Sequence, residues 1–334
     1  MNIAHLLPNS VIYPLPAHNG RYDWVLQLAT LQRQAGHTVT IYSNKQSRFD
    51  NGIQSQGIKT VGYDKKDNNI ALLKLALENN HNIYHSHYDE LHYEVAHLTK
   101  KPIVATQHWW PSENTIRLAA ETLPHTVWAV PPTKYMYDFD RAHNIQTNNF
   151  IHHGIDLSFY TKTISRKSDR LLFVGRISPE KNLELAIAAA IASDSPLDIV
   201  GKITSKNIDY WNTLKDDIDG QQIRYLGSKN REEVRDLYST ARAVIFPSGA
   251  NEAFGLVGIE SQACGTPVIA KRGGSRSELM IDEKTGYLCD SLQDFTTAIK
   301  HIDLIKSENC IVFAQQFDVR KMADNYTELY KILI

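Results

Sequence analysis

Two glutamates, Glu252 and Glu260, bracket the stretch of this 334-residue sequence whose residue types are best suited to binding a ligand with an anionic part and hydroxyl groups. The apolar run Ala243–Phe246 before them is typical of a buried parallel strand, and a helical pattern extends from about Gly255 to Cys264 after an intervening loop. A strand end followed by a helix N-terminus presents backbone N–H groups that favour an anion. The spacing suits a nucleotide-sugar, with the diphosphate at the helix end and a carboxylate for hydroxyl groups on either side. The alternative is that Glu252 caps the helix and Glu260 is solvated.

Two cations follow the end of an earlier predicted strand. That strand ends at Gly175, and Pro179 suits the first turn of the helix after it. Arg176 and Lys181 would then lie in a loop at the carboxyl end of a strand, where a cationic pair can neutralise a departing diphosphate without a metal. The alternative is a surface charge cluster in which Lys181 lies beside Glu180.

Loops in the first half of the chain hold further candidates. Gly20, just before a long helical pattern, would let the backbone approach an anion, although a plain loop is the alternative and no GxGxxG pattern is present. His85 and His87 would share one face of a strand, as metal ligands can. No carboxylate or thiolate accompanies them, so we expect them to hydrogen-bond a sugar or other side chains of the site.

Two further pairs of residues leave alternatives open. Trp109 and Trp110 follow a predicted strand and could stack on a sugar ring or pack in the core. Asp138 and Asp140 resemble the DxD pattern with which some transferases hold Mg²⁺. In a helix, however, residues i and i+2 point about 200° apart, so we interpret this segment as a surface helix.

The composition excludes several classes of protein. Hydrophobic residues make up 42% and charged residues 22%, and the net charge of −1 gives no general attraction to nucleic acid or anionic membranes. The three cysteines show no CxxC spacing, so we expect neither disulfides nor a structural zinc site. The N-terminus lacks the basic region of a signal peptide, and no apolar run is long enough to span a membrane. We therefore expect a cytoplasmic protein that is at most peripheral to a membrane.

Strand and helix patterns alternate along the chain, which predicts parallel sheets built from βαβ units. The alternation starts again near residue 171, after a stretch from 150 to 170 that we interpret as an interdomain linker. Strands are expected at Ile3–Leu7, Val39–Tyr42, Ile83–His85, Ile103–Thr106, Thr126–Val130, Leu171–Val174, Leu197–Val200, Ile223–Leu226, Ala243–Phe246 and Pro267–Ala270. Helices are expected at Tyr22–Ala35, Ile70–Glu78, Asp89–Leu98, Glu113–Glu121, Pro179–Ala192, Ile208–Asp216, Arg231–Ser239 and Gly255–Cys264. The chain after residue 288 is expected to be helical to its end.

Taken together, these motifs resemble the retaining glycosyltransferases of family 4 (glycosyl transferases group 1), which have the GT-B fold. The hallmark of that family is a pair of glutamates separated by seven residues, and Glu252 and Glu260 match it. The similarity extends over essentially the whole chain. It also rests on residues 154–156, 173–176, 179–182, 273–274 with Glu278, 286–288 and 316–317.

The resemblance implies an α/β architecture of GT-B type, with two Rossmann-like domains whose parallel sheets face each other across a cleft. Residues 1–155 would form the acceptor-side domain, and residues 156–317 would form the domain that binds the nucleotide-sugar donor. A C-terminal helix within residues 318–334 would cross back onto the first domain.

The resemblance also assigns roles to residues, with Glu252, Arg176, Lys181 and His108 as the catalytic set. Arg176 and Lys181 would bind the donor diphosphate, and His108 would lie near the sugar and the reacting centre. Glu252 would hold hydroxyls of the transferred sugar, and Glu260 would hold those of the ribose. Further donor contacts would come from Asn19, Gly20, Phe254, Gly255, Leu256 and Val257. Asn19 replaces the first glycine of the family's usual Gly-Gly loop, and Arg21 after the loop is also a departure.

The reaction implied is transfer of a hexosyl group, with retained anomeric configuration, from a nucleoside-diphosphate sugar to an acceptor hydroxyl in glycan biosynthesis. UDP-sugars are favoured as donors, with GDP-mannose as the alternative; the acceptor would be a glycan, a lipid-linked sugar or a small molecule. Neither a metal, another cofactor nor nucleic acid is expected to take part. We expect a front-face route, in which the departing phosphate takes the proton of the acceptor. The rival interpretations are a GT-B sugar-nucleotide 2-epimerase or hydrolase, and a catalytically weak, transferase-like binding subunit.

Overall fold

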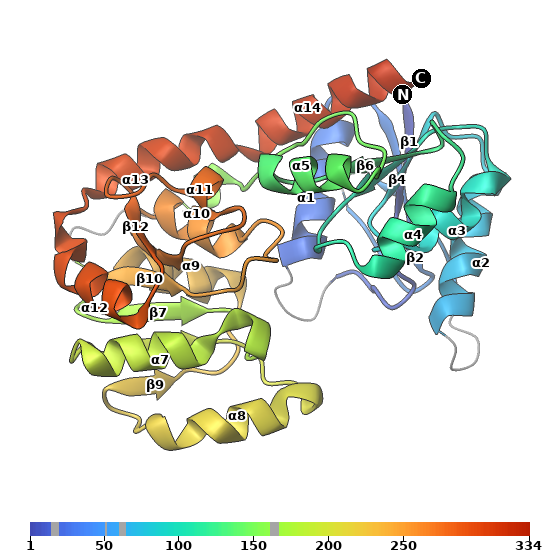
Figure 1. The fold of residues 1–334 in the computed structure, drawn as a ribbon. Coiled ribbons are helices and arrows are strands. Elements are labelled where there is room, and N and C mark those ends of the chain that lie inside the picture. The colour runs from blue at the N-terminus through green and yellow to red at the C-terminus, as the bar shows by residue number, and fades with distance from the viewer. Residues whose placement is uncertain (15–19, 51, 60–64, 161–166) are drawn as a thin grey trace. The chain divides into compact units, whose positions relative to one another are not determined.

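The computed structural model describes residues 1–14, 20–50, 52–59, 65–160 and 167–334 (Figure 1). The chain forms two compact units. The first unit contains Met1–Gly154 and Val319–Ile334, and the second unit contains Ile155–Asp318. Residues 161–166 of the predicted interdomain linker lie outside the described residues.

The first unit is built on a six-stranded parallel sheet with the strand order β3-β2-β1-β4-β5-β6. Its strands are β1 (Asn2–Leu6), β2 (Thr38–Asn44), β3 (Gln54–Ile58), β4 (Ile83–Ser86), β5 (Ile103–Thr106) and β6 (Val127–Val130). Its helices are α1 (Gly20–Gln34), α2 (Lys65–Glu78), α3 (Leu91–Val95), α4 (Glu113–Glu121), α5 (Lys134–Ala142) and α14 (Val319–Leu333). Ile3, Ile41, Ile83 and Val104, from four neighbouring strands, are fully buried in one core cluster.

The second unit is also built on a six-stranded parallel sheet, with the strand order β12-β11-β10-β7-β8-β9. Its strands are β7 (Leu171–Val174), β8 (Leu197–Val200), β9 (Ile223–Tyr225), β10 (Ala243–Phe246), β11 (Val268–Lys271) and β12 (Gly286–Cys289). Its helices are α6 (Leu157–Tyr160), α7 (Leu183–Ala192), α8 (Ile208–Leu214), α9 (Arg231–Thr240), α10 (Leu256–Ala263), α11 (Arg276–Leu279), α12 (Leu292–His301) and α13 (Ser307–Ala314).

Both sheets have the same doubly wound order. In each, the first three strands extend toward one edge and the last three extend toward the other. The strand order therefore reverses between β1 and β4 in the first sheet and between β7 and β10 in the second. Ligands of such folds bind outside the carboxyl ends of the strands at this switch point. The loops after β1, β4, β7 and β10 are thus the places where a site is expected.

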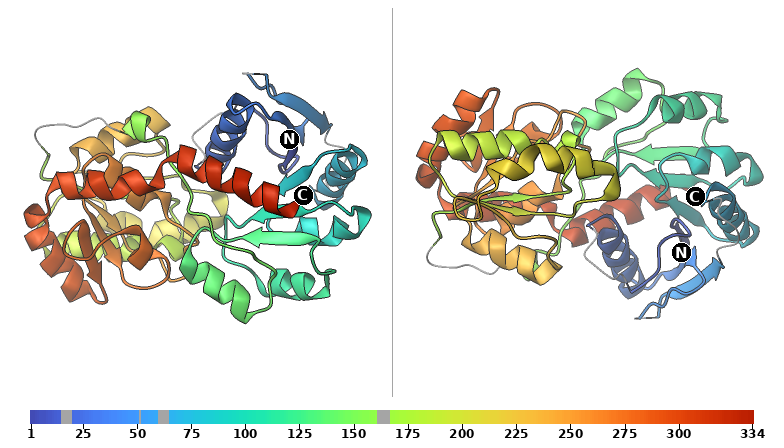
Figure 2. Two further views of the ribbon diagram at one scale, coloured as in Figure 1. Left: turned by 90° about the horizontal axis from the view of Figure 1, so that it is seen from above. Right: turned by 90° about the horizontal axis from the view of Figure 1, so that it is seen from below.

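The C-terminal helix α14 completes the first unit (Figure 2). Its buried residues Met322, Tyr326, Leu329 and Tyr330 recur at the three- and four-residue spacing of a single helix face. They join α1 and the first sheet in one core cluster. The amide of Gly154 also donates a hydrogen bond to the sulfur of Met322 at 3.1 Å. The predicted α/β architecture with two parallel sheets is confirmed, as is the return of the C-terminal helix to the first unit.

Some elements differ from the sequence-based predictions. The pattern does not predict β3, because its residues are mostly polar and lie at the edge of the sheet. It also does not predict β12, a short strand at the edge of the second sheet. The helix expected from Pro179 begins only at Leu183. Among the described helices, none combines the length and the apolar character needed to cross a membrane.

Candidate active site

An ion pair lies at the switch point of the second sheet. Lys181, at the end of the short 3-10 turn Pro179–Lys181 after β7, donates a hydrogen bond from Nζ to Oε2 of Glu252 at 2.5 Å. Glu252 lies in the loop after β10, the strand next to β7. Each side chain is 17% exposed, so the pair is largely withdrawn from water. The structure thus brings together two of the predicted catalytic residues. It shows no capping hydrogen bond from Glu252 to α10, so the capping interpretation is wrong.

A residue with a left-handed backbone conformation fixes the position of Lys181. Asn182 follows the 3-10 turn with a φ of 55°, a conformation that Asn adopts more readily than most residues. Its side-chain amide donates a hydrogen bond to the backbone oxygen of Pro247 at 3.3 Å. This contact joins the loop after β7 to the loop after β10. The left-handed residue also explains why the helix does not start until Leu183.

Arg176 lies in the same loop but has a different partner. Its Nη2 atom is 3.1 Å from Oε1 of Glu180, and the two side chains are about half exposed. Exposed pairs of this kind are held weakly, so Arg176 can exchange Glu180 for an anionic ligand. The surface-cluster interpretation therefore fits Arg176 with Glu180, but it is wrong for Lys181, whose partner is Glu252.

The backbone between Glu252 and α10 depends on a glycine. Gly255 has a φ of 98°, and a Cβ atom at this position would lie 2.6 Å from the ring of Phe246. Both the conformation and the space therefore require glycine. The amides of Leu256 and Val257 belong to the first turn of α10, where backbone N–H groups have no partner inside the helix. These are the groups that an anion at this helix end would contact.

Two residues that the sequence pattern does not single out brace this loop. Ser275 donates from Oγ to the backbone oxygens of Glu252, at 3.2 Å, and Phe254, at 3.0 Å. Arg276 is buried and donates from Nη1 to the backbone oxygen of Gly249 at 2.9 Å. The signal that could have identified them is the pair of glycines just before Ser275, which lets the two loops pack backbone against backbone.

Glu260 lies deeper than Glu252 and has neutral partners. It is 6% exposed, and its two carboxylate oxygens accept hydrogen bonds from the hydroxyls of Tyr160, at 2.7 Å, and Tyr238, at 3.1 Å. Burial, together with the charge of Glu260, raises the pKa of both hydroxyls well above the ordinary value, so both remain donors. The interpretation of Glu260 as a solvated residue is therefore wrong. Each carboxylate oxygen of Glu260 can still accept a second hydrogen bond, so the site leaves room for ribose hydroxyls. The role of Glu260 toward ribose stays a prediction.

Near the switch point of the first sheet the structure places a cluster of histidines. His85 and His87 share one face, as predicted, with ring centroids 4.3 Å apart. His5 of β1 packs against both. His108, the predicted catalytic histidine, follows β5, and its Nε2 atom is 3.1 Å from Nδ1 of His87. Burial lowers the pKa of His5 to about 4 and the pKa values of the other three well below the ordinary value, so all four rings are neutral near pH 7.

Three of these histidines lie at the spacing of a metal site. His5, His85 and His87 each offer a nitrogen atom within 4.8 Å of the others. All six ring nitrogens nevertheless have hydrogen-bond partners, which are His87 and Gln32 for His5, Thr106 and Tyr330 for His85, and His5 and His108 for His87. A metal ion would have to displace these bonds. The histidines therefore hydrogen-bond other side chains, which is one of the two outcomes expected from the sequence. Several of these partners are buried in the core of the first unit.

The first βα loop is described only at its end. Gly20 is the first residue of α1, and Asn19 lies outside the described residues. Arg21 forms an ion pair with Asp89, with Nη2 3.1 Å from Oδ1, and also donates a hydrogen bond to the backbone oxygen of His87. This cation therefore ties α1 to the loop after β4.

The two tryptophans have different environments. Trp110 packs against the rings of Tyr135 and Phe139, with ring centroids 5.5 and 4.6 Å away. Trp109 is 46% exposed. Packing is therefore the role of Trp110, whereas stacking on a sugar ring stays a prediction for Trp109.

The two aspartates of the DxD pattern point to different sides of α5. Asp138 is exposed and pairs with Lys134, whereas Asp140 is fully buried and accepts a hydrogen bond from Gln107 at 3.3 Å. Burial raises the pKa of Asp140 to about 7. The predicted divergence of the carboxylates is confirmed, so they do not form one metal site. The surface-helix interpretation is correct for Asp138 and wrong for Asp140.

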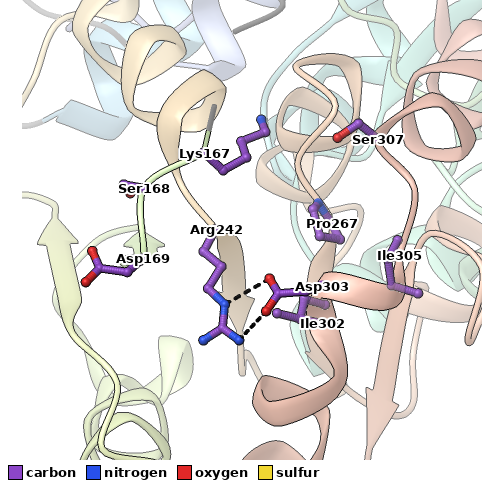
Figure 3. Close-up of a pocket in the computed structure, with 9 residues that line it drawn as sticks. All are labelled: Lys167, Ser168, Asp169, Arg242, Pro267, Ile302, Asp303, Ile305 and Ser307. Carbon is purple, nitrogen blue, oxygen red and sulfur yellow. Dashed lines mark hydrogen bonds and ion pairs between the residues drawn. The ribbon is translucent and has the colours of Figure 1, made fainter. Parts of the chain in front are cut away.

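A pocket of about 590 Å³ lies at the amino ends of β7, β10 and β11 (Figure 3). Arg242 and Asp303 form a two-bond ion pair across it, at 3.0 and 2.6 Å. Lys167 donates from Nζ to Oγ1 of Thr266 at 2.6 Å. The pocket lies opposite the strand ends where doubly wound folds bind their ligands, so we do not assign it to the active site.

Comparison with known proteins identifies the family. Residues 158–328, more than half of the chain, match the family described as Glycosyl transferases group 1. The D-inositol 3-phosphate glycosyltransferase of Mycobacteroides abscessus is 31% identical over an alignment of 203 residues that covers 54% of this chain and 46% of that protein. The protein of the same name from Mycolicibacterium smegmatis is 29% identical over an alignment of 247 residues that covers 63% of this chain and 56% of that protein. The matched part thus spans about half the length of these relatives.

Solved structures resemble the whole chain. The sucrose-phosphate synthase of Thermosynechococcus elongatus has a TM-score of 0.84 at 18% identity, covering 99% of this chain and 98% of that one. HepE from Anabaena, in complex with UDP-glucose, has a TM-score of 0.79 at 18% identity, covering 99% of each chain. Similarity at this level of identity establishes the fold. The chain therefore belongs to the glycosyl transferases group 1 family and has the GT-B fold.

Proposed function

We propose that this protein transfers a hexosyl group from a nucleoside-diphosphate sugar to an acceptor hydroxyl. The observation that carries the proposal is the Lys181–Glu252 ion pair at the switch point of the second sheet, close to the N-terminus of α10. A nucleotide-sugar needs positive charge for its diphosphate and hydrogen-bond acceptors for its sugar hydroxyls, and this pair supplies both. The names of the relatives support the reaction class, and the UDP-glucose bound to HepE supports a UDP-sugar as donor, with GDP-mannose as the alternative.

The charges of the second unit suit a front-face route with retained configuration and without a metal. As the bond from the anomeric carbon to the diphosphate breaks, negative charge grows on the leaving oxygens. Arg176, Lys181 and the first-turn amides of α10 can stabilise that charge. The acceptor oxygen forms the new bond on the same face of the sugar, and its proton passes to the departing phosphate.

The two glutamates take different parts of the donor in this proposal. Glu252 holds hydroxyls of the transferred sugar, because its carboxylate shares the loop with the cation that meets the diphosphate. Glu260 holds the ribose, with its carboxylate oriented by Tyr160 and Tyr238. His108 of the first unit acts near the reacting centre.

A transfer assay tests the proposal. The protein is incubated in EDTA with a panel of UDP- and GDP-sugars, with and without acceptor alcohols and sugars, and the products are analysed by NMR. We expect a new glycoside of unchanged anomeric configuration in the presence of an acceptor. Conversion of the donor sugar at the same rate without an acceptor would favour the epimerase or hydrolase instead. Donor binding without turnover of any donor would favour the binding subunit.

A further inference from the structure

Eight side chains of the first unit form one continuous chain of hydrogen bonds, which we call the His108 relay. In order, its members are His108, His87, His5, Gln32, Tyr330, His85, Thr106 and Tyr326. Successive polar atoms lie between 2.6 and 3.2 Å apart. The members come from β1, β4, β5 and α1, from the loops that follow β4 and β5, and from the C-terminal helix α14. Elements from both ends of the chain must therefore be in place for the relay to form.

The amide of Gln32 determines which group donates and which accepts in each hydrogen bond of the relay. Its Oε1 atom can only accept a hydrogen bond, so Nε2 of His5 must carry a hydrogen. A neutral imidazole carries one ring hydrogen, so Nδ1 of His5 is an acceptor and Nε2 of His87 donates to it. The same reasoning places the hydrogen of His108 on Nε2, which donates to Nδ1 of His87. Nδ1 of His108 is then left as an acceptor.

The Nε2 group of the same amide sets the donors and acceptors in the other half of the relay. Its Nε2 group can only donate, and it donates to the hydroxyl oxygen of Tyr330. The Tyr330 hydroxyl then donates to Nδ1 of His85, whose Nε2 donates to Thr106. Every bond therefore runs away from His108, and no ring needs a second hydrogen. Reversal of the Gln32 amide would reverse every bond and place the hydrogen of His108 on Nδ1.

We propose that Gln32 and Tyr330 are positioning residues that hold His108 in the Nε2–H tautomer, so that its Nδ1 atom accepts a hydrogen bond from a substrate hydroxyl. The role toward substrate rests on the proposed function, whereas the tautomer does not. His108 is partly exposed, and across the described residues no hydrogen bond is formed by its Nδ1 atom. Nδ1 is therefore the ring nitrogen of His108 that is left for a sugar or acceptor hydroxyl. A ring of the opposite tautomer would present a donor there instead.

The tautomer can be measured without an activity assay. Long-range ¹H–¹⁵N correlation spectra of the full chain, labelled with ¹⁵N-histidine, distinguish protonated from unprotonated ring nitrogens, and a His108→Gln variant assigns the His108 signals. We expect a protonated Nε2 and an unprotonated Nδ1 in His108, with spectra that are the same in EDTA and in added Zn²⁺. A protonated Nδ1 would overturn the proposal. So would a shift of the His5, His85 and His87 signals on adding Zn²⁺, because it would make these nitrogens metal ligands.

A matched pair of tyrosine variants tests the positioning role. Tyr330→Phe keeps the ring but removes the hydroxyl that accepts from Gln32, so the amide is free to turn and the His108 tautomer should become mixed. We expect kcat to fall about tenfold, with the donor KM unchanged. Tyr84→Phe is the control, because this buried hydroxyl donates to the backbone oxygen of Asn79 at 2.5 Å, outside the relay.

The Tyr84→Phe variant should keep both the tautomer and kcat of the wild type. Equal losses of kcat in the two variants, or an unaltered His108 tautomer in Tyr330→Phe, would contradict the proposal. If the wild type transfers no sugar, the proposed function fails, and the spectra alone then decide the tautomer.

Discussion

The two sheets share one strand order but carry opposite kinds of polar chemistry near their switch points. The second sheet has ionised groups in its loops, with Lys181 paired to Glu252 in a partly buried position and Arg176 paired to Glu180 at the surface. The first has an ion pair, Arg21 with Asp89, but its other polar groups are neutral imidazoles and hydroxyls that satisfy one another in a buried relay. The fold thus determines where functional side chains gather. The residues beside the strand ends determine whether the site meets an anion or a neutral hydroxyl.

The physical reason for the difference is the cost of burying charge. A charged group in the core must be paired and hydrogen-bonded, or it loses its charge. Lys181 and Glu252 keep some exposure and have each other, so both can stay charged. The relay residues are mostly fully buried and include no carboxylate, so their histidines are held neutral. Substitutions of the ionised groups in the second unit should therefore change turnover and anion affinity directly, whereas substitutions in the first unit should act through the His108 tautomer or through stability.

The largest effect is expected from removing the partly buried cation of the second unit. Lys181→Ala withdraws positive charge from the leaving diphosphate and leaves Glu252 without its partner. We expect kcat to fall about 1000-fold, measured with the donor that the transfer assay identifies. Lys229→Ala is the control, because Lys229 pairs with Glu233 on the surface of the same unit, and kcat should stay within twofold of wild type. A loss of less than tenfold in Lys181→Ala would show that this cation does not support the leaving group.

In the first unit, the buried carboxyl of Asp140 should make stability depend on pH. Burial raises its folded-state pKa to about 7, above its value in the unfolded chain. The folded state therefore binds the proton more tightly than the unfolded chain, and this tighter binding stabilises the fold at low pH. The stabilisation is lost as the pH rises through about 7. Asp140→Asn should raise the free energy of unfolding at pH 8 by up to about 4 kcal/mol and by little at pH 4. Urea unfolding of Asp138→Asn, the exposed neighbour, should show no such gain. Equal behaviour of the two variants would contradict the assignment.

A smaller effect is expected at the glycine before α10. Gly255→Ala would place a Cβ atom against the Phe246 ring and force alanine into a left-handed conformation. We expect a loss of about 2 kcal/mol in the free energy of unfolding, together with weaker donor binding. Gly258→Ala, inside the same helix, meets Phe246 only at the ordinary distance of 3.9 Å and should be neutral or stabilising. Thermal unfolding of the two variants and the wild type measures the difference. A Gly255→Ala protein as stable as wild type would show that the loop can rearrange.

The smallest effect separates the two glutamates. Glu260→Ala should raise the donor KM, by about tenfold, more than it lowers kcat, because it removes ribose contacts and the acceptor of two tyrosine hydroxyls. Glu252→Ala should do the reverse, because its carboxylate lies beside the cation that stabilises the leaving group. Steady-state kinetics with the preferred donor give both values. Similar changes in the two variants would contradict the assignment of Glu252 to the sugar and Glu260 to the ribose, although both residues could still belong to the donor site.

The sequence predicts most of the second-unit site because its signals are local. Apolar runs mark the buried strands, and polar residues directly after them identify the loops with Arg176, Lys181 and Glu252. What the pattern does not reveal is which ions pair. Glu180 is adjacent to Lys181 in sequence, yet the left-handed turn at Asn182 directs Lys181 to Glu252, 71 residues away.

The relay of the first unit is beyond sequence patterns for a different reason. Gln32 and Tyr330 are single polar groups on otherwise ordinary helix faces, and they lie 298 residues apart in the chain. Their meeting depends on the packing of α14 against α1, which no short-range signal encodes. Of this relay, the sequence predicts the shared face of His85 and His87, and the family resemblance adds the role of His108 and the return of the helix that carries Tyr326 and Tyr330 to the first unit.

The most direct test of the central claim is nucleoside-diphosphate binding by the second unit without a metal. Isothermal titration of UDP, GDP and ADP in EDTA should be carried out on the wild type and on a variant with both Arg176→Ala and Lys181→Ala. We expect one of the three to bind the wild type and the affinity to fall about 100-fold in the double variant, because two charge-assisted contacts are lost. Absence of binding by all three, or equal affinity in the double variant, would contradict the assignment of this ionic site to the donor diphosphate.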